Sequence, residues 1–301
     1  MDPVVVGLGL GIGILVGMTG MGGASLMTPL LILVVGTAPV TAIGTDIFYG
    51  AVTKTVGGWR HLKQHTVHLG MVFWLAVGSV PAALAGVSVI EYLQNHYGED
   101  TVNQVALGMV GAALMVVGVA TLIRNLFLRD VIPDRYAMHL YRRHKITAVI
   151  TGLVTGFIIG LTSAGSGTLI AIVLIAVFRL TPQRVVGTDI VHAAVLLWAA
   201  GLANWVGSNI DFGLAANILV GSIPGVLIGA HFSTRVPQTL LRNALGVVLC
   251  GSAVTLLIKE QSPASVLVPA FAVAGAFIVG LLIFQAMLHR QHQPKPQPAR
   301  T

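Results

Sequence analysis

Residues 9–47 read GLGIGILVGMTGMGGASLMTPLLILVVGTAPVTAIGTDI, and residues 152–190 read GLVTGFIIGLTSAGSGTLIAIVLIAVFRLTPQRVVGTDI. These stretches open an internal repeat, because residues 9–86 align without a gap to residues 152–229, 143 positions later. About 25 of the roughly 78 aligned pairs are identical, which is typical of a duplicated unit. In an apolar chain, a duplicated half with glycine-broken segments is typical of a membrane transporter.

The composition indicates a protein that crosses a membrane several times. Of the 301 residues, 55% are hydrophobic and 9% are charged, and the mean hydropathy is +0.88. Soluble domains contain about 25% charged residues. The net charge of +7 comes from basic residues in short loops between apolar segments, which argues against a nucleic-acid partner. We therefore predict an all-α polytopic protein of the cell (inner) membrane; a soluble helical core is the alternative.

Eleven apolar segments alternate with short polar stretches along the chain. They cover residues 4–16, 25–36, 40–58, 69–90, 102–123, 146–161, 168–178, 184–206, 212–232, 239–258 and 264–288. Six or seven of them have the roughly 20 residues that cross a hydrocarbon core of about 30 Å. The two short pairs, 4–16/25–36 and 146–161/168–178, each flank a Gly/Ser/Thr-rich break, at residues 17–23 and 160–167. Each short pair is predicted to form a broken helical hairpin.

Loop charge indicates how the hairpins are threaded. If each returns to its starting side, 15 of the 17 Lys and Arg residues lie on one face, while Glu91, Glu99, Asp100 and Asp211 lie on the other. The positive-inside rule then places the C-terminus in the cytoplasm and the N-terminus outside. Each repeat holds a hairpin and three crossings, so the two repeats are predicted to have inverted topology. Re-entrant and fully crossing hairpins fit this parity equally well.

The predicted organisation has five parts. They are repeat 1 (1–124), a basic cytoplasmic loop (125–145), repeat 2 (146–260), a final transmembrane helix (261–289) and a disordered tail (290–301).

The two breaks are the predicted binding site for a small anion. Helix N-termini in a break present backbone N–H groups and the positive end of the helix dipole, and nearby hydroxyls add donors. The predicted substrate-binding residues are Thr19, Gly20, Gly22, Gly23, Lys54, Thr162, Ser163, Gly165 and Ser166. The alternative is that the glycines only permit close helix packing.

The repeated Gly-Thr-Asp-Ile runs place carboxylates inside apolar segments. We expect Asp46 and Asp189 to couple protons or to gate, together with Thr45, Thr188 and a buried His192, because intramembrane charges are costly and usually functional. The alternative is that each carboxylate caps a helix N-terminus or links to the opposing hairpin.

Lys54 interrupts the symmetry of the repeat. It lies in the middle of segment 40–58, and its twin is Leu197. A single fixed cation in an otherwise neutral pocket suits an anion. An ion pair with Asp46, or extension of the side chain to the cytoplasmic face, is the alternative.

Other classes of function find little support in the sequence. There is no Gly-x-x-x-x-Gly-Lys-Ser/Thr loop for ATP, and no cofactor or metal is expected. An intramembrane enzyme would have to use Ser163 or Ser166 with His192. The alternative function is an anion or ion channel that uses the same breaks as a filter.

The glycine pattern resembles the sulfite exporter TauE/SafE family, also called the 4-toluene sulfonate uptake permeases. The matching residues are Gly13, Gly17, Gly20, Gly22, Gly23, Pro29, Pro39, Gly44 and Thr45, with a weaker second copy over 160–188. The resemblance implies seven to nine spans and transport, often export, of sulfite, sulfonates or related small anions. We also expect protons to be the coupling ion and the protein to form a homo-oligomer.

Overall fold

The computed structural model describes residues 2–19, 24–127, 141–165, 167–232 and 238–259. Within these residues the chain forms ten α-helices and no strand. The helices are α1 (Pro3–Thr19), α2 (Ala24–Leu30), α3 (Pro39–Lys63), α4 (Leu69–Tyr97), α5 (Glu99–Phe127), α6 (Arg142–Thr162), α7 (Thr168–Ala176), α8 (Pro182–Val206), α9 (Phe212–Phe232) and α10 (Gln238–Lys259). A π-helical turn, Leu31–Val35, continues α2.

These helices coincide with ten of the predicted apolar segments, and the eleventh, 264–288, lies outside the described residues. Among the described helices, α4, α5, α6, α8 and α9 are long and apolar enough to cross a membrane. This confirms an all-helical fold with several membrane-spanning segments. The count is below the predicted six or seven partly because α3 carries Asp46 and Lys54 and ends on a basic turn.

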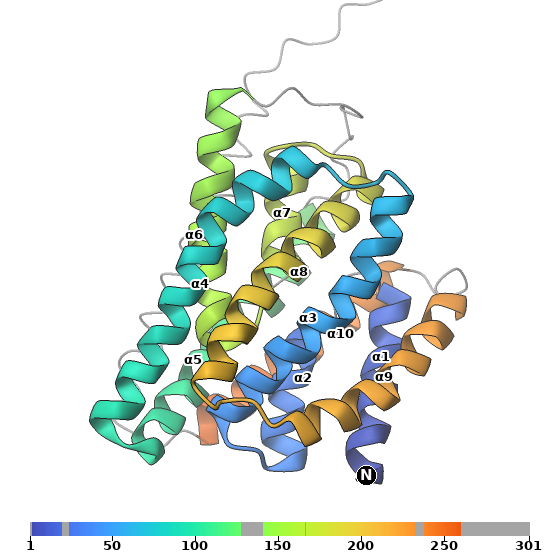
Figure 1. Cartoon of the computed structure of the whole chain (residues 1–301). Coiled ribbons are helices and arrows are strands. Elements are labelled where there is room, and N and C mark those ends of the chain that lie inside the picture. The colour runs from blue at the N-terminus through green and yellow to red at the C-terminus, as the bar shows by residue number, and fades with distance from the viewer. Residues whose placement is uncertain (1, 20–23, 128–140, 166, 233–237, 260–301) are drawn as a thin grey trace, which may run out of the picture.

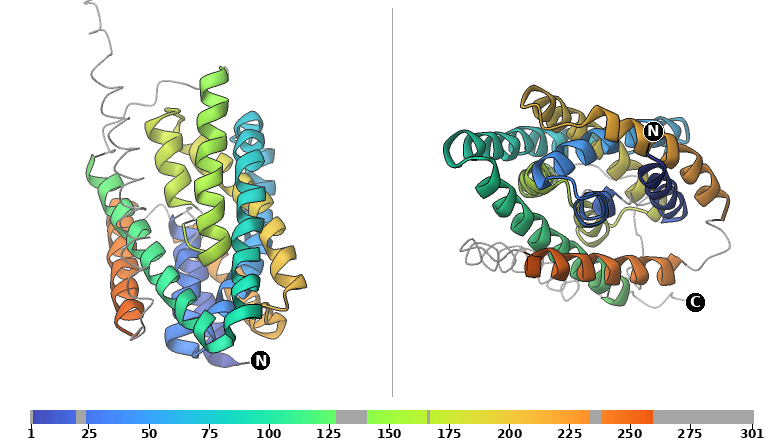
Figure 2. Two further views of the ribbon diagram at one scale, coloured as in Figure 1. Left: turned by 90° about the vertical axis from the view of Figure 1, so that its left-hand side faces the viewer. Right: turned by 90° about the horizontal axis from the view of Figure 1, so that it is seen from below.

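The helices pack mainly in pairs drawn from the two halves of the chain. Helix α1 packs on α9, α6 packs on α4, α3 packs on α8, and α5 packs on α10 (Figures 1 and 2). A shift of 143 residues turns the α1–α9 pair into the α6–α4 pair. Each half of the chain therefore completes the packing of the other.

The short helices α2 and α7 lie inside the ring of longer helices. In Figure 1, α2 occupies the lower half of the molecule and α7 the upper half. Residues 169–174 of α7 and residues 26–28 of α2 are all buried. The described residues of the second break, 160–165, are buried as well, so this break lies in the protein interior, where irregular backbone at membrane depth is tolerated.

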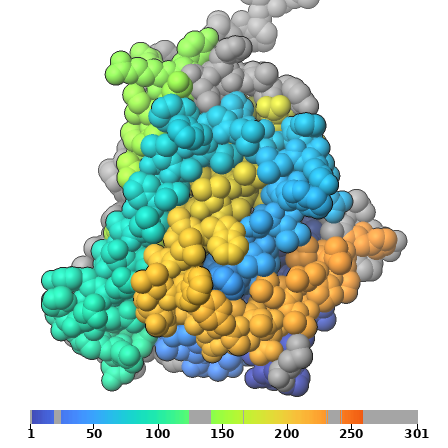
Figure 3. Space-filling model, in the orientation of Figure 1, coloured from blue at the N-terminus to red at the C-terminus, as the bar shows by residue number. Residues whose placement is uncertain are grey.

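The outer surface is apolar, as a lipid-facing surface requires. Large hydrophobic side chains are exposed on nearly every long helix, including Phe73, Trp198 and Leu202. On the face seen in Figure 3, α8 lies between α4 and α3, and α9 closes the surface below. A lipid bilayer is the medium that this surface suits.

Glycines set the distance between the paired backbones. A Cβ added to Gly9 or Gly13 of α1 would collide with a backbone carbonyl of α9, that of Ile218 or Ser222. The twin glycines of α6, at 152 and 156, meet the twin carbonyls of α4 in the same way. Small residues permit such close approach, which is a main source of attraction between helices in lipid. Among the break glycines, for which close packing was the alternative, Gly160 has such a contact, because an added Cβ would collide with the carbonyl of Ala83 in α4.

Gly13→Ala should destabilise the fold by about 1–3 kcal/mol, because the added methyl forces α1 away from α9. The matched control is Gly11→Ala on the same helix, where nothing lies within 4 Å of an added Cβ. The control should leave stability within about 1 kcal/mol of the wild type. Thermal unfolding in detergent measures both, and equal melting temperatures for the two variants would contradict this account.

Candidate functional site

The second break, residues 160–167, touches the start of α2. Helix α6 ends in left-handed backbone at Ser163 (φ 58°), and Gly165 has φ 100°. Only glycine adopts the latter conformation readily. The N–H of Gly165 donates to Ser25 Oγ at 3.2 Å, in the first turn of α2. The second break therefore contacts the residue that closely follows the first break.

Asp46 connects both hairpins. Its carboxylate oxygen Oδ2 accepts hydrogen bonds from Thr28 Oγ1 of α2 at 2.5 Å and from Ser163 Oγ of the second break at 2.9 Å. The side chain is 1% exposed, and its other oxygen, Oδ1, has no hydrogen-bond partner among the described residues. The link to the opposing hairpin, one of the two sequence interpretations, is present in the structure.

Thr45 and Thr188 hold the starts of two helices in the opposite halves. The Asp211 N–H donates to Thr45 Oγ1 at 3.1 Å, and the His68 N–H donates to Thr188 Oγ1 at 3.0 Å. These donors immediately precede α9 and α4. The hydroxyls therefore anchor helix ends, a role that the sequence interpretation as coupling or gating residues did not include.

Lys54 lies close to carboxylates from both repeats. It is 6% exposed and interacts electrostatically most strongly with Asp189 of α8 and less with Asp46. Asp189 is 3% exposed, and its Oδ2 lies 3.5 Å from a Cβ built on Gly167, at the N-terminus of α7. From the sequence, an ion pair between Asp46 and Lys54 was one alternative. In the structure α3 packs on α8, and the electrostatic interaction of Lys54 is stronger with Asp189 than with Asp46.

His192 is fully buried on α8 and shares a hydrogen bond of 2.8 Å between its Nε2 and Ser79 Oγ of α4. Ser163 donates to Asp46 instead. The serine–histidine pair that an intramembrane enzyme would need is therefore not formed between Ser163 and His192. The predicted buried polar role of His192 agrees with its position.

The backbone donors of the second break are largely occupied. The N–H groups of residues 163, 164, 165 and 167 donate to Ile159 O, Thr162 Oγ1, Ser25 Oγ and Gly165 O, respectively. Thr162 Oγ1 itself donates to Ile158 O at 2.7 Å. The prediction of free N–H groups thus fails for these four positions in this conformation. An anion here would depend on side chains and on the first turn of α7.

The structure does not describe several of the predicted substrate-binding residues. Gly20, Gly22, Gly23 and Ser166 lie outside the described residues, and Thr19 ends α1 with its side chain undescribed.

Sequence reasoning missed Ser25, Thr28 and Ser79, which bond to the second break, Asp46 and His192. Ser25 and Thr28 are spaced by three in an apolar run, which places both hydroxyls on one helix face. That spacing was a usable signal for a polar site.

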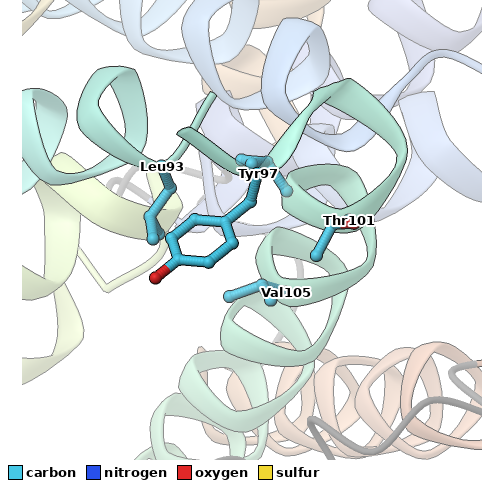
Figure 4. A pocket seen from close by; sticks show the side chains of 5 residues that line it. Leu93, Tyr97, Thr101 and Val105 are labelled. Atoms are coloured by element: carbon cyan, nitrogen blue, oxygen red, sulfur yellow. The ribbon is translucent and has the colours of Figure 1, made fainter. Parts of the chain in front are cut away.

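A pocket of about 190 Å³ lies elsewhere, at the junction of α4 and α5 (Figure 4). It is lined by Leu93, Tyr97, Thr101, Val102 and Val105. No charged side chain lines it, so it does not suit an anion. The part of the chain that the structure describes also holds no group of three or more His, Cys, Asp or Glu arranged for a metal ion.

Comparison with known proteins identifies the chain's relatives. It is 39% identical over 258 residues to the "Probable membrane transporter protein YjnA" of Bacillus subtilis, covering 85% of this chain and 100% of that protein. It is 27% identical over 237 residues to the "Probable membrane transporter protein YdhB" of the same organism, covering 78% and 91%. No solved structure gives a significant match.

The family described as "Sulfite exporter TauE/SafE" matches residues 5–256, which include the aligned repeats and all ten described helices except the first residues of α1 and the last residues of α10. The relatives' names and the apolar helices agree with a membrane transporter rather than an enzyme. The chain belongs to the sulfite exporter TauE/SafE family.

Proposed function

We propose that this protein is a secondary transporter of a small anion, with sulfite, a sulfonate or a related sulfur oxyanion as the substrate. The family description supports the sulfur oxyanion, and it also favours export. The observation that carries the proposal is the buried group of Asp46, Lys54 and Asp189 beside the second break. Intramembrane charges of this kind mark substrate or ion pathways.

The substrate would bind where the two hairpins approach each other. Lys54 would supply the positive charge. The hydroxyls of Ser163 and Thr28, which both donate to the carboxylate of Asp46, lie in the same region. Because the carboxylates offset the charge of Lys54, the site would hold an anion loosely enough to release it. Multi-span carriers need such moderate affinity, since a tightly held ion would not leave.

Alternating access would come from the two repeats rocking against each other, as in other transporters with inverted repeats. Three features support inverted topology. The helix pairs α1–α9 and α6–α4 correspond under the 143-residue shift, and so do the hydrogen bonds at Thr45 and Thr188. In Figure 1, α2 and α7 lie in opposite halves of the molecule.

Inverted topology predicts that twin residues at helix ends face opposite sides of the membrane. Lys63 and its twin Val206 are both exposed at the ends of α3 and α8. In a Cys250→Ser background, a membrane-impermeant maleimide should label Val206→Cys in intact cells and Lys63→Cys only in inside-out vesicles. Labelling of both from the same side would refute the inverted arrangement.

Lys54→Met should abolish exchange of labelled sulfite across liposomes, because the anion loses its positive partner. The same change leaves Asp189 without its main electrostatic partner and should cost about 3 kcal/mol of stability. Leu197→Met, at the twin position, is the control and should leave exchange unchanged and stability within about 1.5 kcal/mol.

The double variant Lys54→Met/Asp189→Asn separates the two roles of Lys54. It removes both charges, so we expect stability to return while exchange stays absent. If exchange also returns, Lys54 serves only to balance Asp189, and its role in binding the anion is wrong.

A further inference from the structure

The twin carboxylates, Asp46 and Asp189, have different surroundings. Lys54 interacts more strongly with Asp189 than with Asp46. Asp46 is instead bound by two hydroxyls, from Thr28 and Ser163, which carry no net charge. The asymmetry arises because Lys54 has Leu197 as its twin. The electrostatic interaction of Lys54 with Asp189 is therefore stronger than its interaction with Asp46.

The titratable groups around Asp46 come from two helices. Tyr49 and Lys54 share α3 with it, and Asp189 and His192 of α8 interact electrostatically with Lys54. The second break and α2 contribute the hydroxyls of Ser163 and Thr28, which are uncharged donors, to its carboxylate. The acidic groups that precede or begin α9 and α5, namely Asp211, Glu99 and Asp100, are exposed at the outer ends of the bundle. Lys54 is thus the cation that the described structure places near Asp46.

The sum of these charges decides what the site can bind. Ionised Lys54 and Asp189 cancel, so ionised Asp46 leaves the group with one negative charge. A like charge at close range in a buried site repels an anion strongly. A proton on Asp46 Oδ1 removes that charge and turns this oxygen into a donor that an anion oxygen can accept. Anion binding and protonation of Asp46 therefore favour each other.

We propose that Asp46 takes up one proton with each anion, so that the protein is a proton–anion symporter. This rests on the proposed function. The O–H bond of Asp46 forms on the side where the anion enters and breaks on the side where it leaves. The proton and anion move in the same direction, so the sum of their gradients sets the direction. An inward proton gradient drives uptake, and a large cytoplasmic anion pool drives export.

The test uses the full-length protein in liposomes and labelled sulfite. Exchange without a pH gradient measures anion binding and translocation, and accumulation with acid outside measures coupling. The wild type should show both, and a pH dye trapped inside should report sulfite-dependent proton entry above that of empty liposomes. Asp46→Asn should exchange more slowly, because it alters the anion site, and it should lose the acceleration by the pH gradient, measured as the ratio of gradient-driven to exchange flux.

Asp189→Asn is the matched control at the twin position. It should exchange more slowly, yet keep the wild-type ratio of gradient-driven to exchange flux. Protonation of sulfite in solution is the same for every variant at a given pH, so a difference between the variants reports the protein. The conservative Asp46→Glu variant should retain a response to the gradient, since it keeps a carboxyl group.

The outcomes are distinguishable. Wild-type protein without sulfite exchange would overturn the proposed function, and this inference with it. Wild-type exchange without proton entry would overturn the inference alone, and this measurement also decides the matter if Asp46→Asn does not fold. A gradient response in Asp46→Asn equal to the wild type would likewise refute the assignment of the proton to Asp46.

Discussion

The close approach of backbones in the α1–α9 and α6–α4 pairs is the constraint on which the rest of this structure depends. Lipid offers no hydrophobic gain when two apolar helices meet, so their association relies on contact area and close packing. Glycines at positions 9, 13, 152 and 156 supply that contact, and no side chain fits in their place. Each pair joins the first helix of one hairpin to a long helix of the other half. The hairpins are thereby held across the molecule.

This cross-packing explains why the polar groups meet in the interior. Once α6 is fixed to α4, the second break lies near Asp46 of α3 and Asp189 of α8. Asp46 then receives hydroxyls from α2 and from the second break, while Asp189 lies at the start of α7 and beside Lys54. Each buried carboxylate gains either donors or a cation, which lowers the cost of its burial. The proposed transport site therefore uses residues that also link the two hairpins.

The two halves share packing and hydrogen bonds at many twin positions and differ at a few buried polar positions. The twin hydrogen bonds of Thr45 and Thr188 show a structural task that is kept in both halves. Lys54 and Leu197, or Tyr49 and His192, show positions where the halves differ. Two identical halves would give both carboxylates the same surroundings. A single lysine gives the two carboxylates different surroundings, and this difference is the basis of the proposed proton coupling at Asp46.

The sequence alone determined the helices, their breaks and the candidate charges, because apolar length, glycine clusters and buried ionisable residues are local signals. It also predicted the repeat, which the shared offset of 143 residues makes visible. Only the tertiary structure decided which partners these groups have. Lys54 is eight residues from Asp46 in sequence, yet α3–α8 packing makes Asp189 its stronger partner. Likewise, the N–H groups of the second break are mostly occupied, because Ser25 and the end of α6 lie within reach. Partners brought in from distant segments leave no mark in local sequence, since their choice depends on how the two halves pack.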